Sequence, residues 1–417
     1  MSTREAPSRH RVDASVIALW VSGFCSITAS LTAVTALGKQ VYDITGRTLD
    51  LGLIGLAEFA PAFFLVLVSG AVADRYDRRR VATLAGLGAA ACGFGLAWYA
   101  STDPTAVAPI FLLVIAFGTS RAFVNPAARA LPADVVPPDR YPWLVARSSF
   151  VMQSGFVAGP VIGGSLYAVD PVAPYVAMGA LSLGSAIAIS FVRLHDSAVR
   201  RERSNERMTA RQTIGDALSG LQFIRTQPVL LGAISLDLFA VLFGGAVALL
   251  PAIAEDRLHV GSVGYGWLRA AVGIGSAVVT LVLIRRPVTR RVGRVLLASI
   301  AVFGAFTVLL GVTTNYVVAF VAIAALSGAD AVSVFIRATL LPLVTPAQLR
   351  GRVMAVEMVF IGASNELGAF ESGVAGELFG APAAVVLGGV ATILVGVLWW
   401  LVFPALRDVD RFPRVAE

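Results

Sequence analysis

Ionisable side chains inside long apolar segments are the chemically notable residues of this 417-residue sequence. Nine lie in such segments: Glu58, Arg121, Asp237, Arg269, Asp330, Arg337, Glu357, Glu366 and Glu371. A charged side chain in lipid costs roughly 2.5–3.5 kcal/mol or more, so such residues must face a cavity or one another. A carboxyl group in an apolar, intermittently wet cavity can also load and release a proton near neutral pH. These residues therefore predict proton binding or ion pairing within a membrane.

Four of the acids are candidates for proton coupling. Glu58 is the only buried acid expected in the first half of the chain. Asp237 lies in the seventh apolar segment, which is the counterpart of the first segment under a twofold repeat. Glu366 and Glu371 are further candidates in the eleventh segment. Glu357 and Arg337 lie near the inner ends of their segments, where we expect a gate or surface role. The alternative for each acid is a structural ion pair with an arginine inside the segments.

Five residues are candidates for lining a cavity or forming ion pairs. Arg121 and Asn125 are four residues apart and therefore share a face of the fourth segment. Asp330 and Arg337 are seven residues apart, hence on one face of the tenth segment and about 10 Å apart along its axis. Arg269 lies in the eighth segment. Each of these residues predicts a polar inner surface rather than a lipid-facing one.

Composition indicates an integral membrane protein. Hydrophobic residues make up 57% of the chain and charged residues only 14%, which excludes an ordinary soluble domain. Apolar runs of roughly 18 or more residues recur, each long enough to cross a bilayer as a helix. We expect an all-α protein with twelve transmembrane spans, at residues 15–38, 50–72, 81–101, 107–128, 144–168, 171–192, 229–251, 262–284, 293–313, 316–342, 352–378 and 382–405.

The basic residues predict the orientation of these spans. If the N-terminus is cytoplasmic, 27 of the 33 basic residues lie in or beside the termini and cytoplasmic loops. Only Lys39, Arg47 and Arg257 then lie outside, and three more arginines lie within spans. Because cytoplasmic loops are enriched in Lys and Arg, we expect both termini on the cytoplasmic side. The net charge of +7 is explained by this orientation and indicates no nucleic-acid partner.

The twelve spans divide six and six around one polar stretch. We expect an N-terminal half at residues 1–192, a cytoplasmic linker at 193–228 and a C-terminal half at 229–417. Apolar residues from Ile214 to Ile224 recur at helical spacing, so the linker is expected to hold an amphipathic helix. Arginine-rich loops follow the second and the eighth span, which indicates duplication of a six-span unit. Such a repeat predicts two pseudo-symmetric halves with a site between them near the membrane midplane.

A motif after the second span predicts a conformational latch. It consists of Gly70, Asp74, Arg75, Arg78 and Arg79. The Asp74 carboxylate, at the end of one span, can accept hydrogen bonds from the N-terminal amides of another helix in one state and lose them in another. This pattern resembles the loop 2–3 motif of the major facilitator superfamily, which helps to latch the cytoplasmic side. The sequence departs from that motif at Asp77, where the family has a glycine for a tight turn.

A second motif lies in the fifth span. It consists of Gly155, Gly159, Pro160, Gly163 and Gly164. Glycines at every fourth residue form a smooth stripe along which a neighbouring helix can approach closely, and the proline should bend the span. Ordinary small-residue packing is the alternative interpretation. The pattern Gly-x-x-x-Gly-Pro-x-x-Gly-Gly resembles the motif of exporters and antiporters in the same superfamily, which implies export.

A closer resemblance covers most of the chain. Segments 235–239, 351–353 and 364–373 resemble the branch of the superfamily that contains the enterobactin exporter and macrolide-efflux proteins. The resemblance implies proton-driven export of a drug or siderophore from the cytoplasm, powered by the proton motive force without a bound cofactor. It further implies a monomer in a bacterial inner membrane whose partners are the substrate, protons and lipid.

Two other classes of function are alternatives. A proton-coupled importer or symporter of a small metabolite can use the same fold. A membrane-embedded enzyme is disfavoured, because His10, His195 and His259 lie outside the spans and no cluster has metal-ligand or catalytic-triad spacing. Cys25 and Cys92 both lie within spans, so we expect no disulfide and no metal site.

The expected mechanism is rocking of the two halves about a central cavity. Protonation of Glu58 or Asp237 from outside would favour return to the inward-open state. An aromatic lining of the cavity is also expected, although lipid-facing or packing positions are the alternative. The candidates for such a lining are Phe24, Phe59, Phe63, Phe64, Phe239 and Phe243.

Overall fold

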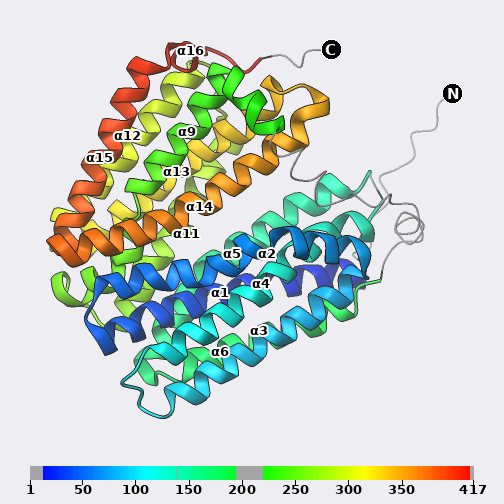
Figure 1. Ribbon diagram of the computed structural model, residues 1–417, viewed down its shortest axis with the longest axis vertical. Coiled ribbons are helices and arrows are strands. Elements are labelled where there is room, and N and C mark those ends of the chain that lie inside the picture. The colour runs from blue at the N-terminus through cyan, green and yellow to red at the C-terminus, as the bar shows by residue number, and fades with distance from the viewer. Residues whose placement is uncertain (1–12, 138, 194–218, 414–417) are drawn as a thin grey trace.

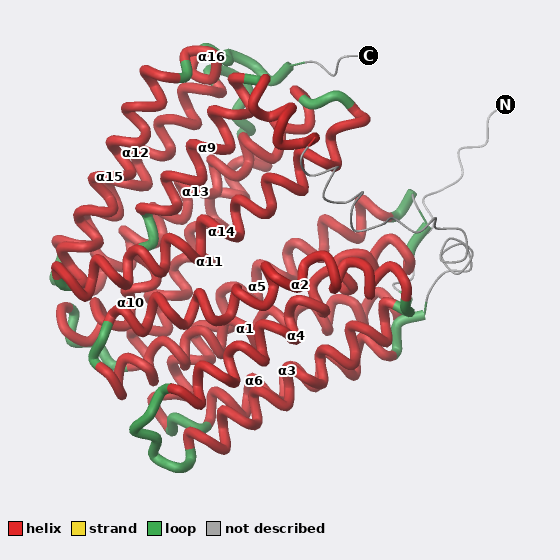
Figure 2. Tube along the Cα trace, in the orientation of Figure 1, coloured by secondary structure: helices red, strands yellow, loops and turns green. Residues whose placement is uncertain are grey.

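The computed structural model shows an entirely helical arrangement in the part of the chain that it describes, residues 13–137, 139–193 and 219–413. On the second helix, the description excludes the side chains of Val66, Leu67 and Asp74. The N-terminal half contains six long helices: α1 (Ala14–Thr45), α2 (Thr48–Arg75), α3 (Arg78–Ala100), α4 (Ala108–Val135), α5 (Tyr141–Val169) and α6 (Ala173–Ser190). Loops lie mainly at the two ends of these helices (Figure 2).

The C-terminal half repeats this plan with one interrupted span. Its elements are α9 (Pro228–Phe243), η1 (Ala246–Leu249), α10 (Leu250–Ala252), η2 (Ile253–Arg257), α11 (Ser262–Arg285), α12 (Val292–Val312), α13 (Tyr316–Val344), α14 (Ala347–Phe379), α15 (Ala381–Val402) and α16 (Pro404–Arg407). With α9 to η2 counted as one span, eleven described helices are long and apolar enough to cross a membrane. The 29-residue helix α5 is the twelfth long helix. The prediction of twelve membrane helices in two six-helix halves is thus confirmed.

The seventh span differs from the continuous helix expected over 229–251. Helix α9 ends at Phe243, and the chain passes through Gly244 and Gly245 before η1 begins. A Cβ atom on Gly245 would lie 2.4 Å from the carbonyl oxygen of Gly368, so α14 approaches this backbone too closely for any side chain. Glycine permits the approach, and the helical hydrogen bonds are interrupted there.

Each half has its own apolar core, and the outer surface is apolar as well. Leu96, Ile110 and Tyr175 are fully buried in the N-terminal half, and Leu230 and Leu340 in the C-terminal half. Large apolar side chains also cover the outside, Trp98 and Leu401 among them. A surface of this kind matches hydrocarbon rather than water.

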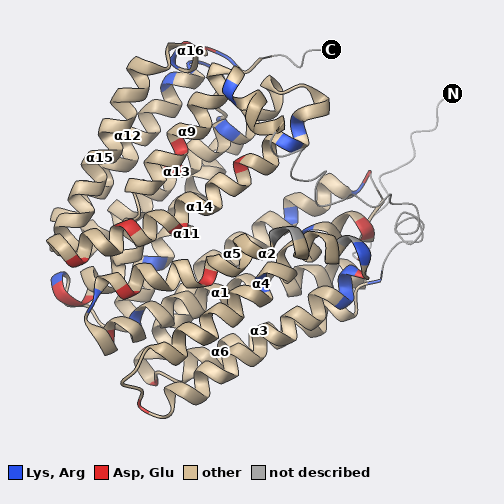
Figure 3. Cartoon of the chain, viewed as in Figure 1, with Lys and Arg blue, Asp and Glu red and all other residues tan. Residues whose placement is uncertain are grey.

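The two halves contact each other near one end and diverge toward the other (Figure 1). Contacts between them run mainly along α2 with α14 and along α5 with α11. We name the end where the halves meet the Gly46 face, because it holds the α1–α2 turn, and the opposite end the Asp77 face, because it holds the α2–α3 turn. Many of the basic residues lie at the Asp77 face (Figure 3).

Asp77 forms a tight turn without the glycine that the family motif carries. Only Tyr76 and Asp77 separate α2 from α3, and Asp77 has a φ of −54°, which an L-residue adopts without strain. Its carboxylate accepts a hydrogen bond from the Arg79 backbone at 2.9 Å and pairs with the Arg79 side chain at 2.8 Å. Arg78 bonds Asp134 of α4 at 2.7 Å. The aspartate therefore serves as the N-cap of α3.

The ionisation of Asp77 follows from these contacts. Partial burial alone would raise the pKa of Asp77, but the side-chain and backbone hydrogen bonds from Arg79 outweigh it and lower the pKa below its ordinary value. The stabilisation by the charged cap is therefore complete above the unfolded-state pKa of about 3.9 and is lost as the pH falls through the lower folded-state value.

Replacing Asp77 by alanine should destabilise the protein by about 1 kcal/mol, because α3 loses its N-cap. Thermal unfolding of the purified protein at neutral pH measures the loss. Asp77→Asn is the matched control: it keeps a capping oxygen and should lose less stability than Asp77→Ala. Equal unfolding temperatures for wild type and Asp77→Ala would contradict the capping role.

Candidate functional site

A cavity of about 730 Å³ lies between the two halves. Five of the nine ionisable residues predicted inside spans line it: Glu58, Arg121, Arg269, Asp330 and Glu366. They come from α2, α4, α11, α13 and α14, so both halves contribute charge. A volume of this size suits a ligand of drug-like dimensions. The structure therefore brings together residues that are far apart in sequence into one polar and apolar compartment.

The cavity is closed toward the Gly46 face by close backbone contacts. Thr48 donates a hydrogen bond to the carbonyl oxygen of Gly373 at 3.1 Å, which joins α2 to α14. A Cβ atom on Gly164 would lie 2.6 Å from the Cα atom of Gly266, so α5 and α11 also touch. Deeper in the molecule, the Gln153 amide donates to the carbonyl oxygen of Gly273 at 2.7 Å. These contacts seal one end of the cavity.

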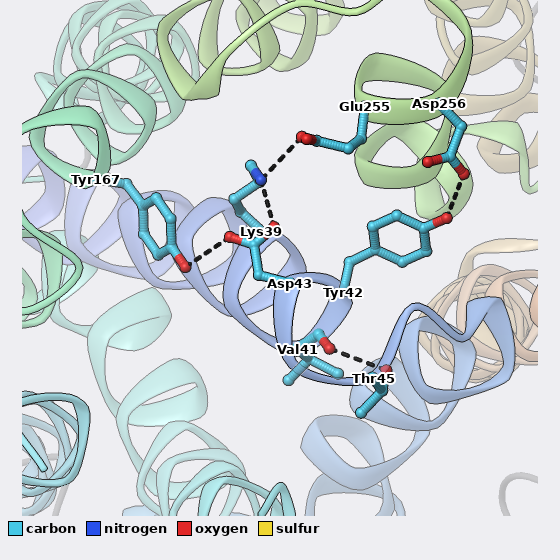
Figure 4. A network of polar contacts seen from close by, with 8 residues as sticks. All are labelled: Lys39, Val41, Tyr42, Asp43, Thr45, Tyr167, Glu255 and Asp256. Atoms are coloured by element: carbon cyan, nitrogen blue, oxygen red, sulfur yellow. Dashed lines mark hydrogen bonds and ion pairs between the residues drawn. The ribbon is translucent and has the colours of Figure 1, made fainter. Parts of the chain in front are cut away.

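A network of polar side chains reinforces this seal (Figure 4). Lys39, the only lysine in the chain, is 8% exposed and forms ion pairs with Asp43 on its own helix and, at 3.0 Å, with Glu255 of the other half. The Tyr167 hydroxyl donates to Asp43 at 2.9 Å. One ammonium group thus joins carboxylates from both halves.

Two further contacts cross between the halves at the Gly46 face. The Tyr42 hydroxyl donates to Asp256 of η2. Arg47 pairs with Glu377 of α14 at 3.1 Å, although both side chains are partly exposed. We call these contacts and the Lys39 ion pairs the Gly46-face network. The network consists of ion pairs and one tyrosine–aspartate hydrogen bond, and its Arg47–Glu377 pair is exposed enough for water to compete with it.

Arg121 holds one group of charges on the cavity wall. Its guanidinium pairs with Glu58 of α2 and lies 5.8 Å from the centre of the Phe117 ring. Glu366 of α14 interacts electrostatically with both partners, and a Cβ atom on Gly55 would lie 2.6 Å from its carboxylate. We call Glu58, Arg121 and Glu366 the Arg121 cluster. It spans both halves and combines two carboxylates with one guanidinium.

Arg337 holds a second group of charges, which is buried within the C-terminal half. Its guanidinium pairs with Asp237 of α9 at 2.7 Å and with Glu357 of α14 at 3.2 Å. The exposed fractions of Asp237, Arg337 and Glu357 are 4%, 3% and 4%. We call these three residues the Arg337 cluster. Asp330 lines the cavity and interacts electrostatically with Asp237 and Arg337, which connects the cluster to the cavity.

The Arg337 cluster corrects one expectation. Glu357 and Arg337 were expected to have a gate or surface role, and the surface position is wrong for both, because they are 4% and 3% exposed and paired with each other. Asp330 shares a helix with Arg337, but the ion-pair partners of Arg337 are on two other helices. Side chains seven residues apart are separated by about 10 Å along the axis, which leaves the guanidinium free to pair across the bundle.

A repeated pattern that the sequence analysis did not use marks both arginines. Arg121 is followed by alanine and, five residues on, by Pro126, and Arg337 is likewise followed by alanine and by Pro342. The two arginines lie on α4 and α13, the fourth long helix of each half. The repeat identifies them as counterparts. Their acidic partners lie on different helices in the two halves, so the pattern does not identify those partners.

Other predicted residues lie away from the cavity. Asn125 is exposed, and Glu371 is half-buried with a 3.5 Å contact to Ser372; neither is among the lining residues of the described cavity. The six phenylalanines expected as an aromatic lining are also absent from that set. The described lining has Phe156 and Phe303 as its aromatic residues.

The glycine motif of α5 lies against α1 and α11. A Cβ atom on Gly155 would lie 2.1 Å from Ile27, and one on Gly159 would lie 2.6 Å from Leu31. A Cβ atom on Gly163 would meet the Thr32 carbonyl oxygen at 2.9 Å, while Gly164 and the Pro160 carbonyl oxygen approach Gly266 of α11. The stripe thus allows close backbone packing on two sides.

The loop 2–3 motif is only partly described. Gly70 and Arg75 lie in the last turns of α2, where the guanidinium of Arg75 lies 5.9 Å from the centre of the Tyr76 ring. The Asp74 side chain lies outside the described part of the structure. The latch therefore stays a prediction. Of the linker helix expected from Ile214, residues 219–226 are described and helical.

Comparisons with known proteins agree with this architecture. The profile of the Major Facilitator Superfamily matches residues 19–356. The enterobactin exporter EntS of Shigella flexneri is 26% identical over 399 residues, which cover 95% of this chain and 93% of that protein. EntS of Escherichia coli O1:K1 is also 26% identical over the same shares of the two chains.

Solved structures show the same fold at low sequence identity. The nucleoside transporter NupG superposes with a TM-score of 0.75 at 13% identity, over 94% of this chain and 99% of that chain. A bacterial homologue of the human lysosomal transporter Spinster, in an inward-facing and unoccupied conformation, superposes with a TM-score of 0.67 at 14% identity, over 94% of this chain and 95% of that one.

Replacing Lys39 by alanine should weaken the contact between the halves at the Gly46 face, because Asp43 and Glu255 lose their shared cation. The contact is measured in a protein that carries cysteines in place of Arg47 and Glu377 and alanines in place of Cys25 and Cys92. The readout is the rate at which a short bismaleimide cross-links the two introduced cysteines. We expect cross-linking to slow by roughly fivefold, equivalent to about 1 kcal/mol.

Lys39→Arg is the control, because it keeps the cation and should retain most of the cross-linking rate. An unchanged rate in Lys39→Ala would show that the Gly46-face network does not hold the two halves together.

Proposed function

We propose an export function on one premise: this chain belongs to the major facilitator superfamily of membrane transporters. The proposal is that it exports an amphipathic small molecule, a drug or siderophore, across a bacterial inner membrane by proton antiport. The observation that carries it is a cavity of about 730 Å³ between two halves, closed at one end and lined by charges from both. Rocking of the halves would expose such a cavity alternately to the two sides.

The distribution of arginine supports a cytoplasmic Asp77 face. The turns and helix ends of this face carry Arg78, Arg79, Arg285, Arg286 and Arg352. The Gly46 face carries Lys39, Arg47 and Arg257, and each of them contacts a carboxylate or carbonyl group. Because basic residues accumulate on the cytoplasmic side of membrane proteins, this distribution supports a cytoplasmic location for both termini. The seal at the Gly46 face then corresponds to an inward-facing state, in which substrate enters from the cytoplasm or inner leaflet.

The Arg337 cluster supports proton coupling. Asp237 and Glu357 together carry two negative charges against one guanidinium, and nearby Asp330 adds a third carboxylate. An uncompensated negative charge in a buried, low-dielectric site is costly, and uptake of a proton by one carboxyl removes that cost. A proton taken up from outside would in this way stabilise the inward-facing state and drive the return step.

The Arg121 cluster gives the cavity a second group that can respond to protons. Glu58 and Glu366 come from different halves, and both interact with Arg121: Glu58 by an ion pair and Glu366 electrostatically. Their mutual repulsion when both are ionised would favour separation of the halves at this level, and protonation of one would remove it. The export direction draws on the EntS relatives, which are named as exporters, and on the glycine–proline motif of α5.

Efflux from cells that lack their own pumps tests the proposal. Cells expressing the wild type and loaded with a panel of dyes, macrolides and siderophores should accumulate less of at least one compound, and a protonophore should abolish the difference. Asp237→Asn and Glu58→Gln should each slow efflux by roughly tenfold, equivalent to about 1.4 kcal/mol in the barrier.

Asp103→Asn is the matched control, because it neutralises an exposed acid in the turn between α3 and α4 that does not line the described cavity. Efflux at the wild-type rate is expected for it. Higher accumulation in wild-type cells would indicate import instead, and efflux that survives the protonophore would contradict proton antiport.

A further inference from the structure

Arg269 is partly exposed to the cavity, and it differs from Arg121 and Arg337, the other arginines predicted inside spans, because no described carboxylate lies within ion-pair distance of it. Arg121 pairs with Glu58, and Arg337 pairs with two acids. Arg269 lines the cavity, and its described hydrogen bond is donated to the Tyr265 hydroxyl at 3.3 Å. A guanidinium has five N–H donors, so most of its hydrogen-bonding capacity is unused in this state.

The position of this guanidinium is fixed from one side. Tyr265 lies one turn earlier on α11 and is fully buried. Its hydroxyl lies against α1, since a Cβ atom on Gly38 would be 3.0 Å from that oxygen and 3.2 Å from Pro251. The phenol therefore sits in the seal between the two halves. The Arg269 guanidinium donates its hydrogen bond to this phenol at the closed end of the cavity, and its other N–H groups are available to a ligand.

Apolar side chains form part of the wall of the cavity that Arg269 lines. Leu31 and Val34 of α1, Val272 of α11 and Phe303 of α12 line the same cavity. Asp330 and Glu366 also line it, but neither forms an ion pair with Arg269 within 4 Å. A cation that lacks a paired carboxylate in a cavity partly shielded from water is stabilised when an anion enters. Apolar walls in turn favour a ligand whose remaining surface is apolar.

We propose that Arg269 binds a carboxylate, or a similarly flat oxyanion, of an amphipathic ligand in this cavity. Guanidinium and carboxylate match in a two-pronged arrangement, which gives both strength and orientation. The ligand's apolar part then lies along α1 and α12. This inference rests on the proposed transport function for its ligand, but it concerns binding alone and requires neither a direction of transport nor a proton.

Binding of two matched probes tests the proposal. Dansyl-leucine carries a carboxylate, and dansyl-leucinamide is its neutral isostere. Fluorescence titration of the purified protein in nanodiscs should show that the wild type binds the acid at least roughly tenfold more tightly than the amide. Arg269→Gln should abolish this preference and bind the amide as the wild type does. Arg269→Lys should keep part of the preference, because a point charge replaces the planar fork.

Two further variants test whether the preference for the acid comes from Arg269 itself, rather than from the net charge of the protein or from the neighbouring acid Asp330. Arg285→Gln removes the same charge from the exposed end of α11 and should keep the full preference. Asp330→Asn should keep or increase it, since it removes a negative charge from the cavity. Loss of the preference in either variant would overturn the proposal.

Three results with the wild type and Arg269→Gln would also overturn it. The first is that the wild type binds both probes equally, and the second is that it binds neither. The third is that Arg269→Gln lowers the affinity for both probes equally, which would show that the arginine maintains the structure of the cavity. The outcome is separable from that of the efflux test. If the protein prefers the acid but does not export, the carboxylate-binding proposal holds and the export proposal fails. If it exports without this preference, only the carboxylate-binding proposal fails.

Discussion

A fully buried guanidinium in a membrane protein is stable only beside compensating carboxylates, and the packing of the C-terminal half reflects that constraint. Arg337 of α13 is 3% exposed and forms ion pairs with Asp237 of α9 and Glu357 of α14. Removing Arg337 would leave two buried carboxyl groups without their counter-charge, which costs several kcal/mol if they stay ionised. Arg121 holds Glu58 in the same way at the cavity wall. The charges that secure the packing of the helices are therefore also the groups best placed to exchange protons.

The contacts between the halves are of a different kind. Along α2 with α14 and along α5 with α11, glycines bring the backbones together, as Gly164 and Gly266 show. The Gly46-face network adds polar contacts, and water can replace the exposed Arg47–Glu377 pair among them at low cost. Small-residue packing and hydrated ion pairs can form and separate without exposing a large apolar core. A seal built from them suits an interface that opens, whereas the apolar cores within the halves suit rigid bodies.

The sequence allowed the fold to be predicted more fully than the site. Lipid permits few backbone solutions, so hydropathy alone predicts twelve helices, and the structure confirms them. The break after Phe243 was missed, because it depends on the close approach of Gly368 from α14. An ion pair with an arginine was the alternative for each acid, and the structure confirms it for Asp237 and Glu357. Which arginine pairs with which acid was not predicted, because the contact joins three helices and spacing along one helix says nothing about contacts across a bundle. The repeated Arg-Ala-x-x-x-Pro pattern was present in the sequence and would have identified Arg121 and Arg337 as counterparts.

The central claim is that proton binding shifts the balance between states open at the two faces. Double electron–electron resonance, which measures distances between pairs of spin labels, tests it most directly. The labels are attached to introduced cysteines in a protein whose native Cys25 and Cys92 are replaced by alanine. One pair, at Val145 and Ile284, reports the Asp77 face, and another, at Val169 and Val263, reports the Gly46 face; all four positions are exposed. Lowering the pH from about 8 to about 5 should lengthen the first distance and shorten the second, because protonation of buried carboxyls stabilises the inward-facing state. Distances that stay constant, or that change in the same direction at both faces, would contradict the account.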